Sequence, residues 1–189
     1  MGLGVQRNML RFLRKYPTFI SHFADTELFF PVMLAKAAVE GGYGTSLAAR
    51  TRNNFFGINN GRAKFSSPDE AFKFQRDLYY KEPYKSKNVL GATTPLEQLR
   101  RMSDSGYYMM DNDGSLPKSI TKDAVWNNSR QRWIRPNGQV LKWTKEQSFE
   151  RYIDTLKPFI DDALAIIPYG KIKSRDLASI TSSLNDKNV

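Results

Sequence analysis

The sequence predicts a mainly helical α+β fold, because helix start signals recur along it and only two short segments resemble β-hairpins. Three segments, "SPDE", "TPLE" and "TKEQ", place Glu or Gln three positions after a Ser or Thr, which is the capping-box pattern. Two Asn-Gly dipeptides, at 60–61 and 137–138, lie between short extended runs. Each predicts a two-residue hairpin turn.

The remaining helices follow from apolar residues at three- and four-residue spacing. A first helix should end at Pro17, a second should run from about Pro31 to Gly41, and Ser46 should cap a short third one. The last helix has the clearest stripe, and Pro158 should kink it. The stripe consists of Phe149, Tyr152, Ile153, Leu156, Phe159, Ile160, Ala163, Leu164 and Ile167.

Length and composition favour one domain with a real core. The chain has 189 residues, of which 40% are hydrophobic and 13% aromatic. We expect a single domain over residues 1–170 and a polar, serine-rich tail over 171–189 that is frayed. The chain has no cysteine and one histidine, His22, so disulfides, thiolate zinc sites and most histidine metal sites are excluded. We therefore predict no metal and no cofactor, and assign His22 no role.

The net charge of +10 indicates attraction to a polyanion, or simply a solvated basic surface. A nucleic acid, an anionic membrane surface and an acidic wall polymer would all satisfy it. No long basic block interleaved with aromatic residues is present, so a nucleic-acid partner is not predicted. The N-terminus lacks the features of a secretory signal, and the longest apolar stretch, "LFFPVMLA", is too short to span a bilayer. No membrane span is predicted.

One acid occupies an unusual place. In "AAVEGGYGTS", Glu40 ends an apolar helix and is followed by glycines. The negative end of a helix dipole disfavours a carboxylate there, and the apolar neighbours Val39 and Tyr43 act in the same direction. Both effects favour a protonated acid that can serve as a general acid. The plainer interpretation is an exposed last-turn residue followed by glycine caps.

The segments after Glu40 favour the enzymatic interpretation. "AAVEGGYGTS" is followed by "NNFFGI" and "FSSPDEAF", and then by "EPYKS", "TPLEQLRRM" and "SGYYMMD". In this order they resemble glycoside hydrolase family 73, the autolysin-type endo-β-N-acetylglucosaminidases, over about residues 19–112. The family pattern has Ser where this chain has Gly41 and Trp where it has Tyr43.

The resemblance implies a lysozyme-like fold that cleaves the glycan of peptidoglycan after N-acetylglucosamine, with Glu40 as general acid. The aromatic side chains would line the sugar cleft, although packing in the core is an equal alternative for each. Asn54 and the Gly57 backbone would meet the N-acetyl group. The residues assigned to substrate are Tyr43, Asn54, Phe55, Phe56, Gly57 and Tyr107.

The second catalytic group is not evident. Many family members carry another carboxylate before the "FSSPDEAF" segment, whereas "NNGRAK" contains none. Asp69 is the nearest candidate; Glu70 has a capping task, and Asp111 and Asp113 are alternatives. Assistance by the N-acetyl group of the substrate requires no second acid.

Several functional alternatives share these features. A lytic transglycosylase also depends on one glutamate, and a wall-binding module could keep the scaffold without turnover. A basic DNA-binding protein is a third possibility, tested by salt-sensitive binding. We expect action at the cell wall or periplasm, after delivery by lysis machinery, a virion or a removed leader. The hairpin at 131–143 should extend the cleft or attach the protein to a larger assembly.

Overall fold

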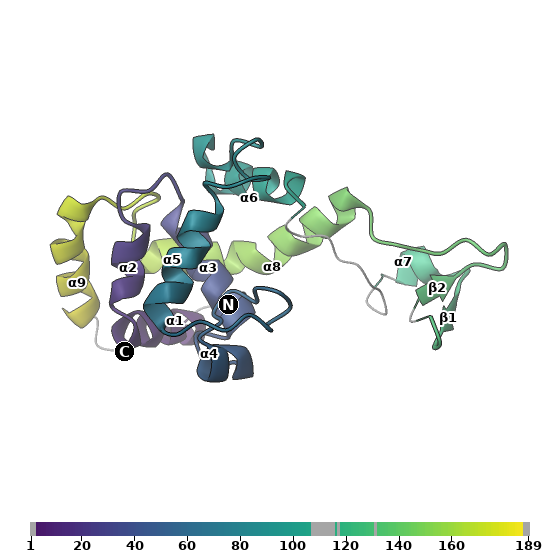
Figure 1. Ribbon diagram of the computed structural model, residues 1–189, viewed down its shortest axis with the longest axis horizontal. Coiled ribbons are helices and arrows are strands. Elements are labelled where there is room, and N and C mark those ends of the chain that lie inside the picture. Colours follow the sequence, from purple (N-terminus) through teal and green to yellow (C-terminus); the bar gives the residue numbers. More distant parts are fainter. Residues whose placement is uncertain (1–2, 107–115, 117, 131, 187–189) are drawn as a thin grey trace.

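The structure is a computed structural model that describes residues 3–106, 116, 118–130 and 132–186 (Figure 1). It is mainly helical, with one small antiparallel sheet, as predicted. The α-helices are α1 (Leu3–Lys15), α2 (Thr18–Phe23), α3 (Phe30–Gly41), α4 (Leu47–Arg52), α5 (Pro68–Leu78), α6 (Pro95–Asp104), α7 (Lys118–Thr121), α8 (Lys145–Ile166) and α9 (Leu177–Asp186). Short 3-10 turns cover Val89–Gly91 and Ser174–Asp176, and the strands are β1 (Val125–Asn127) and β2 (Arg132–Ile134).

Helix α3 is the centre of the core. It is apolar on nearly every side, and ten of its twelve residues are buried, with α8 and α6 packed against it. An aromatic cluster fills the space between α1, α2 and α5, where Phe12, Phe19, Phe55 and Phe72 meet at ring-centroid distances of 5.0–6.5 Å. The chain thus builds its core from large rings that bury much apolar area each.

The predicted helix caps are confirmed. Ser67 and Thr94 each accept a hydrogen bond from the backbone N–H three residues later, and Thr144 forms a complete capping box with Gln147. At α5 and α6 the acid reaches one residue further back than expected: Glu70 accepts from Ser66, not Ser67, and Glu97 accepts likewise from the residue before the cap. Helix α2 was not predicted, since its six residues show too little periodicity.

The first predicted hairpin differs from the structure. Residues 58–64 form turns and no strand. A two-residue hairpin turn needs positive φ at two residues, whereas Asn59, Asn60 and Gly61 all adopt it, at 54°, 52° and 76°. The loop closes through the Gly61 N–H on the Gly57 carbonyl at 3.0 Å. This third left-handed residue prevents the flanking segments from pairing as strands.

The second predicted hairpin exists with a different turn and an additional strand. Arg135 N–H donates to the Gln139 carbonyl and Gly138 N–H to the Arg135 carbonyl, each at 2.9 Å, and Gly138 has φ 83°. This is a longer loop with a left-handed glycine, not a two-residue Asn-Gly turn. Strand β1 was not predicted; it pairs with β2 so that Trp126 lies opposite Trp133.

Helix α8 links two parts of the molecule. Its C-terminal part packs against α3 and α1 within the helical body, and its N-terminal end extends away from that body (Figure 1). Beyond this end lie α7, β1, β2 and the second hairpin, which we call the arm, residues 118–143.

The C-terminal segment forms a helix that packs on the core, whereas we expected a frayed tail. Residues from 171 onward include α9, and Ile172, Ile180 and Leu184 are buried in the main core. Arg14 donates a hydrogen bond of 2.8 Å to the Leu184 carbonyl. Ile180 and Leu184 are four residues apart and lie on one face of α9, so two apolar side chains are enough to bury the helix despite its polar composition. Among the described residues, no helix is long and apolar enough to cross a membrane.

Candidate active site

Glu40 lies in the last turn of α3, half-buried, where the helix stops abruptly. The stop comes from three consecutive residues in the left-handed region, Gly42, Tyr43 and Gly44, with φ of 53°, 55° and 77°. Tyr43 is the uncommon member, since a side chain at positive φ is strained. The sequence thus places Glu40 at a fixed helix end, as predicted.

Two glycines let the loop of residues 53–57 approach this helix end closely. A Cβ atom on Gly41 would lie 2.5 Å from the Phe55 carbonyl oxygen, and one on Gly57 would lie 2.9 Å from Oε2 of Glu40. Gly57 also has a φ of 65°. The Ser-to-Gly departure at position 41 therefore has a structural reason, because this backbone contact leaves no room for a serine side chain.

A chain of hydrogen bonds leads from the core to the Glu40 carboxylate. The hydroxyl of Tyr152, on α8, donates to Oε1 of Glu40 at 3.1 Å. Lys36 Nζ donates to the same hydroxyl at 3.4 Å, and it also lies 5.8 Å from the centre of the tyrosine ring. Lys36 and Glu40 are four residues apart, on one face of α3. The tyrosine thus ties α8 to the end of α3.

Lys36 is completely buried, which is rare for a lysine. Burial disfavours its charged form and lowers the pKa of Lys36 to about 7, while the nearby negative charge of Glu40 opposes this shift. Lys36 therefore changes its protonation state near neutral pH, where a surface lysine stays charged.

The arrangement leaves the two oxygens of Glu40 in different surroundings. Oε1 is held by Tyr152, whereas Oε2 lies against Gly57 and accepts no hydrogen bond from the described residues. Because Oε1 is held and Oε2 accepts no hydrogen bond from the described residues, Glu40 can donate a proton to a bound ligand.

Phe55 and Phe56 were predicted to line a sugar cleft, and the structure corrects this. Phe55 is fully buried and Phe56 is 2% exposed, and both pack against Phe72 in the aromatic core. Neither ring is available to a ligand. Their contribution to the site is to anchor the loop that carries Gly57.

Asn54 is likewise structural. It is fully buried, its amide group donates to the carbonyls of Ile58 and Ala63 at 2.9 and 3.1 Å, and its carbonyl accepts from the Ile58 N–H at 3.0 Å. These bonds hold the turn after Gly57. Contact with an N-acetyl group, the predicted role, would require breaking them.

Tyr43 is the predicted aromatic residue that stays accessible. It is half-buried beside Phe159, at a ring-centroid distance of 6.4 Å. Burial raises the pKa of Tyr43, and the negative charge of Asp162 adds to this. Its place three residues after Glu40 keeps it a candidate for substrate contact. Tyr107, Asp111 and Asp113 lie outside the described residues.

Asp69 is engaged elsewhere. Its carboxylate bonds His22 Nε2 at 2.8 Å, and hydrogen bonds from Thr18 and then from His22 lower the pKa of Asp69. Both partners lie on α2, whereas the partner of Glu40 lies on α8. Among the described residues the two acids share no hydrogen-bond partner, and His22 has a structural task that the sequence did not reveal.

Lys36 and Tyr152 were not predicted from the sequence as members of the site. Lys36 could have been noticed as the only basic residue inside the apolar segment from 30 to 41, one helical turn before Glu40. Tyr152 carried no such signal, because it belongs to an ordinary apolar stripe.

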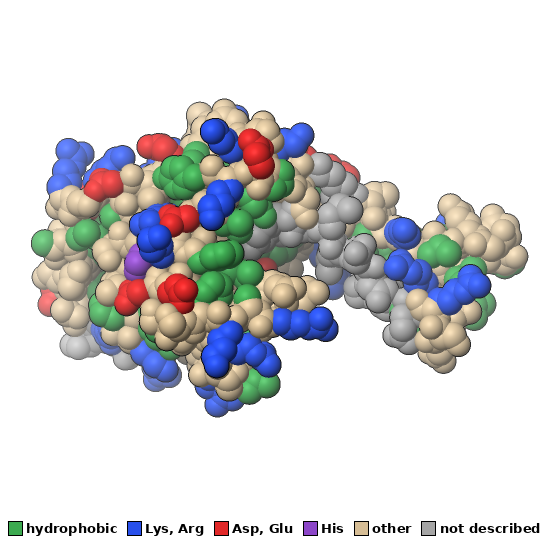
Figure 2. Space-filling view, viewed as in Figure 1, with side chains coloured by type: hydrophobic (Ala, Val, Ile, Leu, Met, Phe, Trp, Pro, Cys, Tyr) green, Lys and Arg blue, Asp and Glu red, His purple; other side chains and the backbone are tan. Residues whose placement is uncertain are grey.

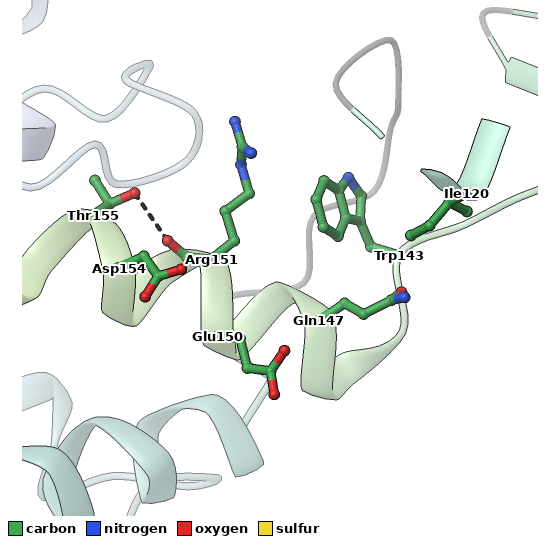
Figure 3. A pocket seen from close by; sticks show the side chains of 7 residues that line it. All are labelled: Ile120, Trp143, Gln147, Glu150, Arg151, Asp154 and Thr155. Carbon is green, nitrogen blue, oxygen red and sulfur yellow. Dashed lines mark hydrogen bonds between the residues drawn. The ribbon is translucent and has the colours of Figure 1, made fainter. Parts of the chain in front are cut away.

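A hollow of about 460 Å³ lies away from Glu40, along the N-terminal half of α8 (Figure 3). Glu150, Arg151 and Asp154 line it, with Arg151 5.4 Å from the centre of the Trp143 ring. Tyr152 faces α3 instead. We therefore base the site on the contacts of Glu40. In the part of the chain described, no cluster of three His, Asp or Glu side chains could hold a metal ion.

A helical α+β fold with a fixed, half-buried glutamate at a helix end is typical of enzymes that cleave glycans by acid catalysis. Comparison with protein families agrees. The glucosaminidase family model, described as mannosyl-glycoprotein endo-beta-N-acetylglucosaminidase, matches residues 16–164. The chain belongs to this family, glycoside hydrolase family 73, and is a glycosidase that acts on peptidoglycan. Searches of curated proteins and of solved structures find no match.

Proposed function

We propose that the protein is an endo-β-N-acetylglucosaminidase that hydrolyses peptidoglycan strands with Glu40 as its general acid. The observation that supports this most directly is the hydrogen bond from Tyr152, which fixes Oε1 and leaves Oε2, beside Gly57, without a hydrogen bond from the described residues. Tyr43, on the same helix end, is proposed to contact the sugar. Peptidoglycan as the substrate follows from the family.

In the first step, protonated Glu40 gives its proton to the glycosidic oxygen while the bond from that oxygen to C1 breaks. The carbonyl oxygen of the substrate's N-acetyl group then bonds to C1 and forms an oxazolinium ion. A water molecule opens this ring and loses a proton to the Glu40 carboxylate, which restores the acid. This route accounts for the separate surroundings of Asp69, since it needs no second carboxylate.

The alternative reaction is that of a lytic transglycosylase, in which a hydroxyl of the same sugar, not water, attacks C1 and leaves an anhydro end. Mass spectrometry of fragments from purified peptidoglycan separates the two. Hydrolysis predicts a reducing N-acetylglucosamine end, which borohydride converts to an alcohol. A product lighter by one water and resistant to borohydride would contradict hydrolysis. Binding without any new end would instead identify a catalytically weak wall-binding module.

We also propose that the protein works at the cell wall or periplasm, where its substrate lies. Delivery by lysis machinery, by a virion or with a leader that is later removed would each bring it there.

A further inference from the structure

The arm, residues 118–143, has an unusual surface for its size. Its two strands pair Trp126 with Trp133 across the sheet, in an edge-to-face contact of 5.6 Å, and both rings are half-buried. Val125 is 72% exposed. Figure 1 shows that the sheet projects away from the helical body. Such a sheet contributes little to the core and is well placed for contact with a partner.

The arm is also strongly basic. It carries six Lys or Arg side chains and one acid, Asp123, which gives a net charge of +5, half of the +10 of the whole chain. Figure 2 shows basic side chains on the visible face of the arm. Lys122, Arg130 and Lys142 are exposed and form no ion pair with another described residue. Charges left unpaired on a projecting element favour an anionic partner.

One continuous helix connects this surface to Glu40. Helix α8 begins directly after Thr144 at the end of the arm and carries Tyr152, the partner of Glu40. At 1.5 Å per residue the distance along the helix between these two positions is about 12 Å. The arm is therefore held near the site by a rigid element, and a polymer bound at Glu40 can reach the arm.

We propose that the arm binds the carboxylates of the stem peptides of peptidoglycan, so that one strand is held both at Glu40 and at the arm. This inference rests on the proposed function, because it takes the cleaved polymer as the partner. Peptidoglycan carries stem peptides with free carboxylates along its glycan, and Arg and Lys side chains pair with carboxylates. The tryptophan pair offers an apolar surface beside them.

The test uses two triple variants, each of which removes three positive charges by Lys→Gln or Arg→Gln replacement. Both are made in a Glu40→Gln background that prevents cleavage. The arm variant combines Lys122→Gln, Arg130→Gln and Lys142→Gln, all exposed positions. The control variant combines Arg7→Gln, Arg11→Gln and Lys81→Gln, which are exposed on the helical body. Binding is measured by sedimentation with purified sacculi free of other polymers, with and without chemical amidation of their carboxylates. Duplex DNA serves as a second anionic probe.

We expect the arm variant to bind intact sacculi about tenfold more weakly than the parent, as the loss of several exposed ion pairs predicts, and the control variant to change little. The parent and the arm variant should bind amidated sacculi equally weakly. Equal loss in both variants would overturn the proposal, since it would show a general charge effect. Unchanged binding by the arm variant would also overturn it and favour attachment of residues 131–143 to a larger assembly. Tighter binding to DNA than to sacculi would contradict it as well.

A cleavage assay separates this proposal from the proposed function. With Glu40 present, the arm variant should release reducing ends from glycan chains stripped of stem peptides as fast as the parent does. If neither protein releases reducing ends from stripped chains or from intact peptidoglycan, the proposed function fails while the binding result still decides the role of the arm. Melting temperature and circular dichroism check that the variants fold.

Discussion

Tyr152 donates a hydrogen bond of 3.1 Å to Oε1 of Glu40, and so joins two helices whose residues are 112 positions apart in the sequence. This contact fixes the acid that we propose to protonate the glycosidic oxygen. It also connects that acid to Lys36, the buried base of α3. The site is therefore built by the packing of α8 against α3 and not by the local motif alone.

Removal of the Tyr152 hydroxyl should impair catalysis without impairing binding. We predict that Tyr152→Phe lowers kcat about tenfold and leaves KM nearly unchanged, since a hydrogen bond to a charged group contributes about 1.5–3 kcal/mol. The measurement is steady-state cleavage of soluble glycan chains. A raised KM with unchanged kcat would assign Tyr152 to substrate binding instead.

Any side chain at position 57 should disturb Glu40. A Cβ atom there would lie 2.9 Å from Oε2, and φ of 65° disfavours alanine. We predict that Gly57→Ala lowers both kcat and the melting temperature. Gly138→Ala is the matched control, because that glycine has φ of 83° but no atom within 4 Å of an added Cβ. It should cost about 1–2 kcal/mol of stability without changing cleavage of stripped glycan chains. Equal activity losses would contradict the contact.

Lys36 should make stability depend on pH in a defined window. Its pKa is lowered from 10.5 to about 7 on folding, so the unfolded chain binds more protons between these values. The contribution of Lys36 to the free energy of unfolding therefore rises from pH 7 to pH 10.5. Below pH 7 the lysine is charged in both states, and its unfavourable contribution is constant.

Replacement of Lys36 by an apolar residue should abolish this dependence. We predict that Lys36→Met increases the free energy of unfolding at pH 7, by at most about 5 kcal/mol, and that the gain shrinks toward pH 10.5. Urea denaturation across this range measures it, with the exposed Lys81→Met as control. A gain independent of pH would show that Lys36 does not titrate in the window.

Asn54 should prove important for stability and not for sugar binding. Asn54→Ala removes three hydrogen bonds, so that the half-buried Ile58 N–H and Ala63 carbonyl lose the partner that Asn54 provides. We predict a loss of about 2–4 kcal/mol in the free energy of unfolding, measured by urea denaturation, with KM unchanged for the remaining folded protein. A raised KM at unchanged stability would restore the predicted contact with the N-acetyl group.

The features that the sequence predicted well are local ones. Ser67, Thr94 and Thr144 cap helices because each hydroxyl accepts from a backbone N–H only three residues later, and Glu40 lies in the last turn of its helix because glycines follow directly. The family resemblance also rested on short segments in order, and the match over residues 16–164 confirms it.

The features that the sequence did not reveal depend on contacts between distant segments. Burial decides that Phe55 and Phe56 are core residues, and the residue types alone fit a cleft equally well. His22 and Asp69 form a pair between α2 and α5, and Lys36 needs Tyr152 from α8. Such partners become visible only when the helices are packed together.

The central claim is that Glu40 is the proton donor, and one comparison tests it most directly. Parent and Glu40→Gln are incubated side by side with purified peptidoglycan, and new reducing ends are measured over time. Glutamine keeps the size of the side chain but carries no acidic proton, so we predict the same melting temperature and a rate lower by about 10²- to 10⁴-fold. A Glu40→Gln protein that releases ends as fast as the parent would contradict the claim.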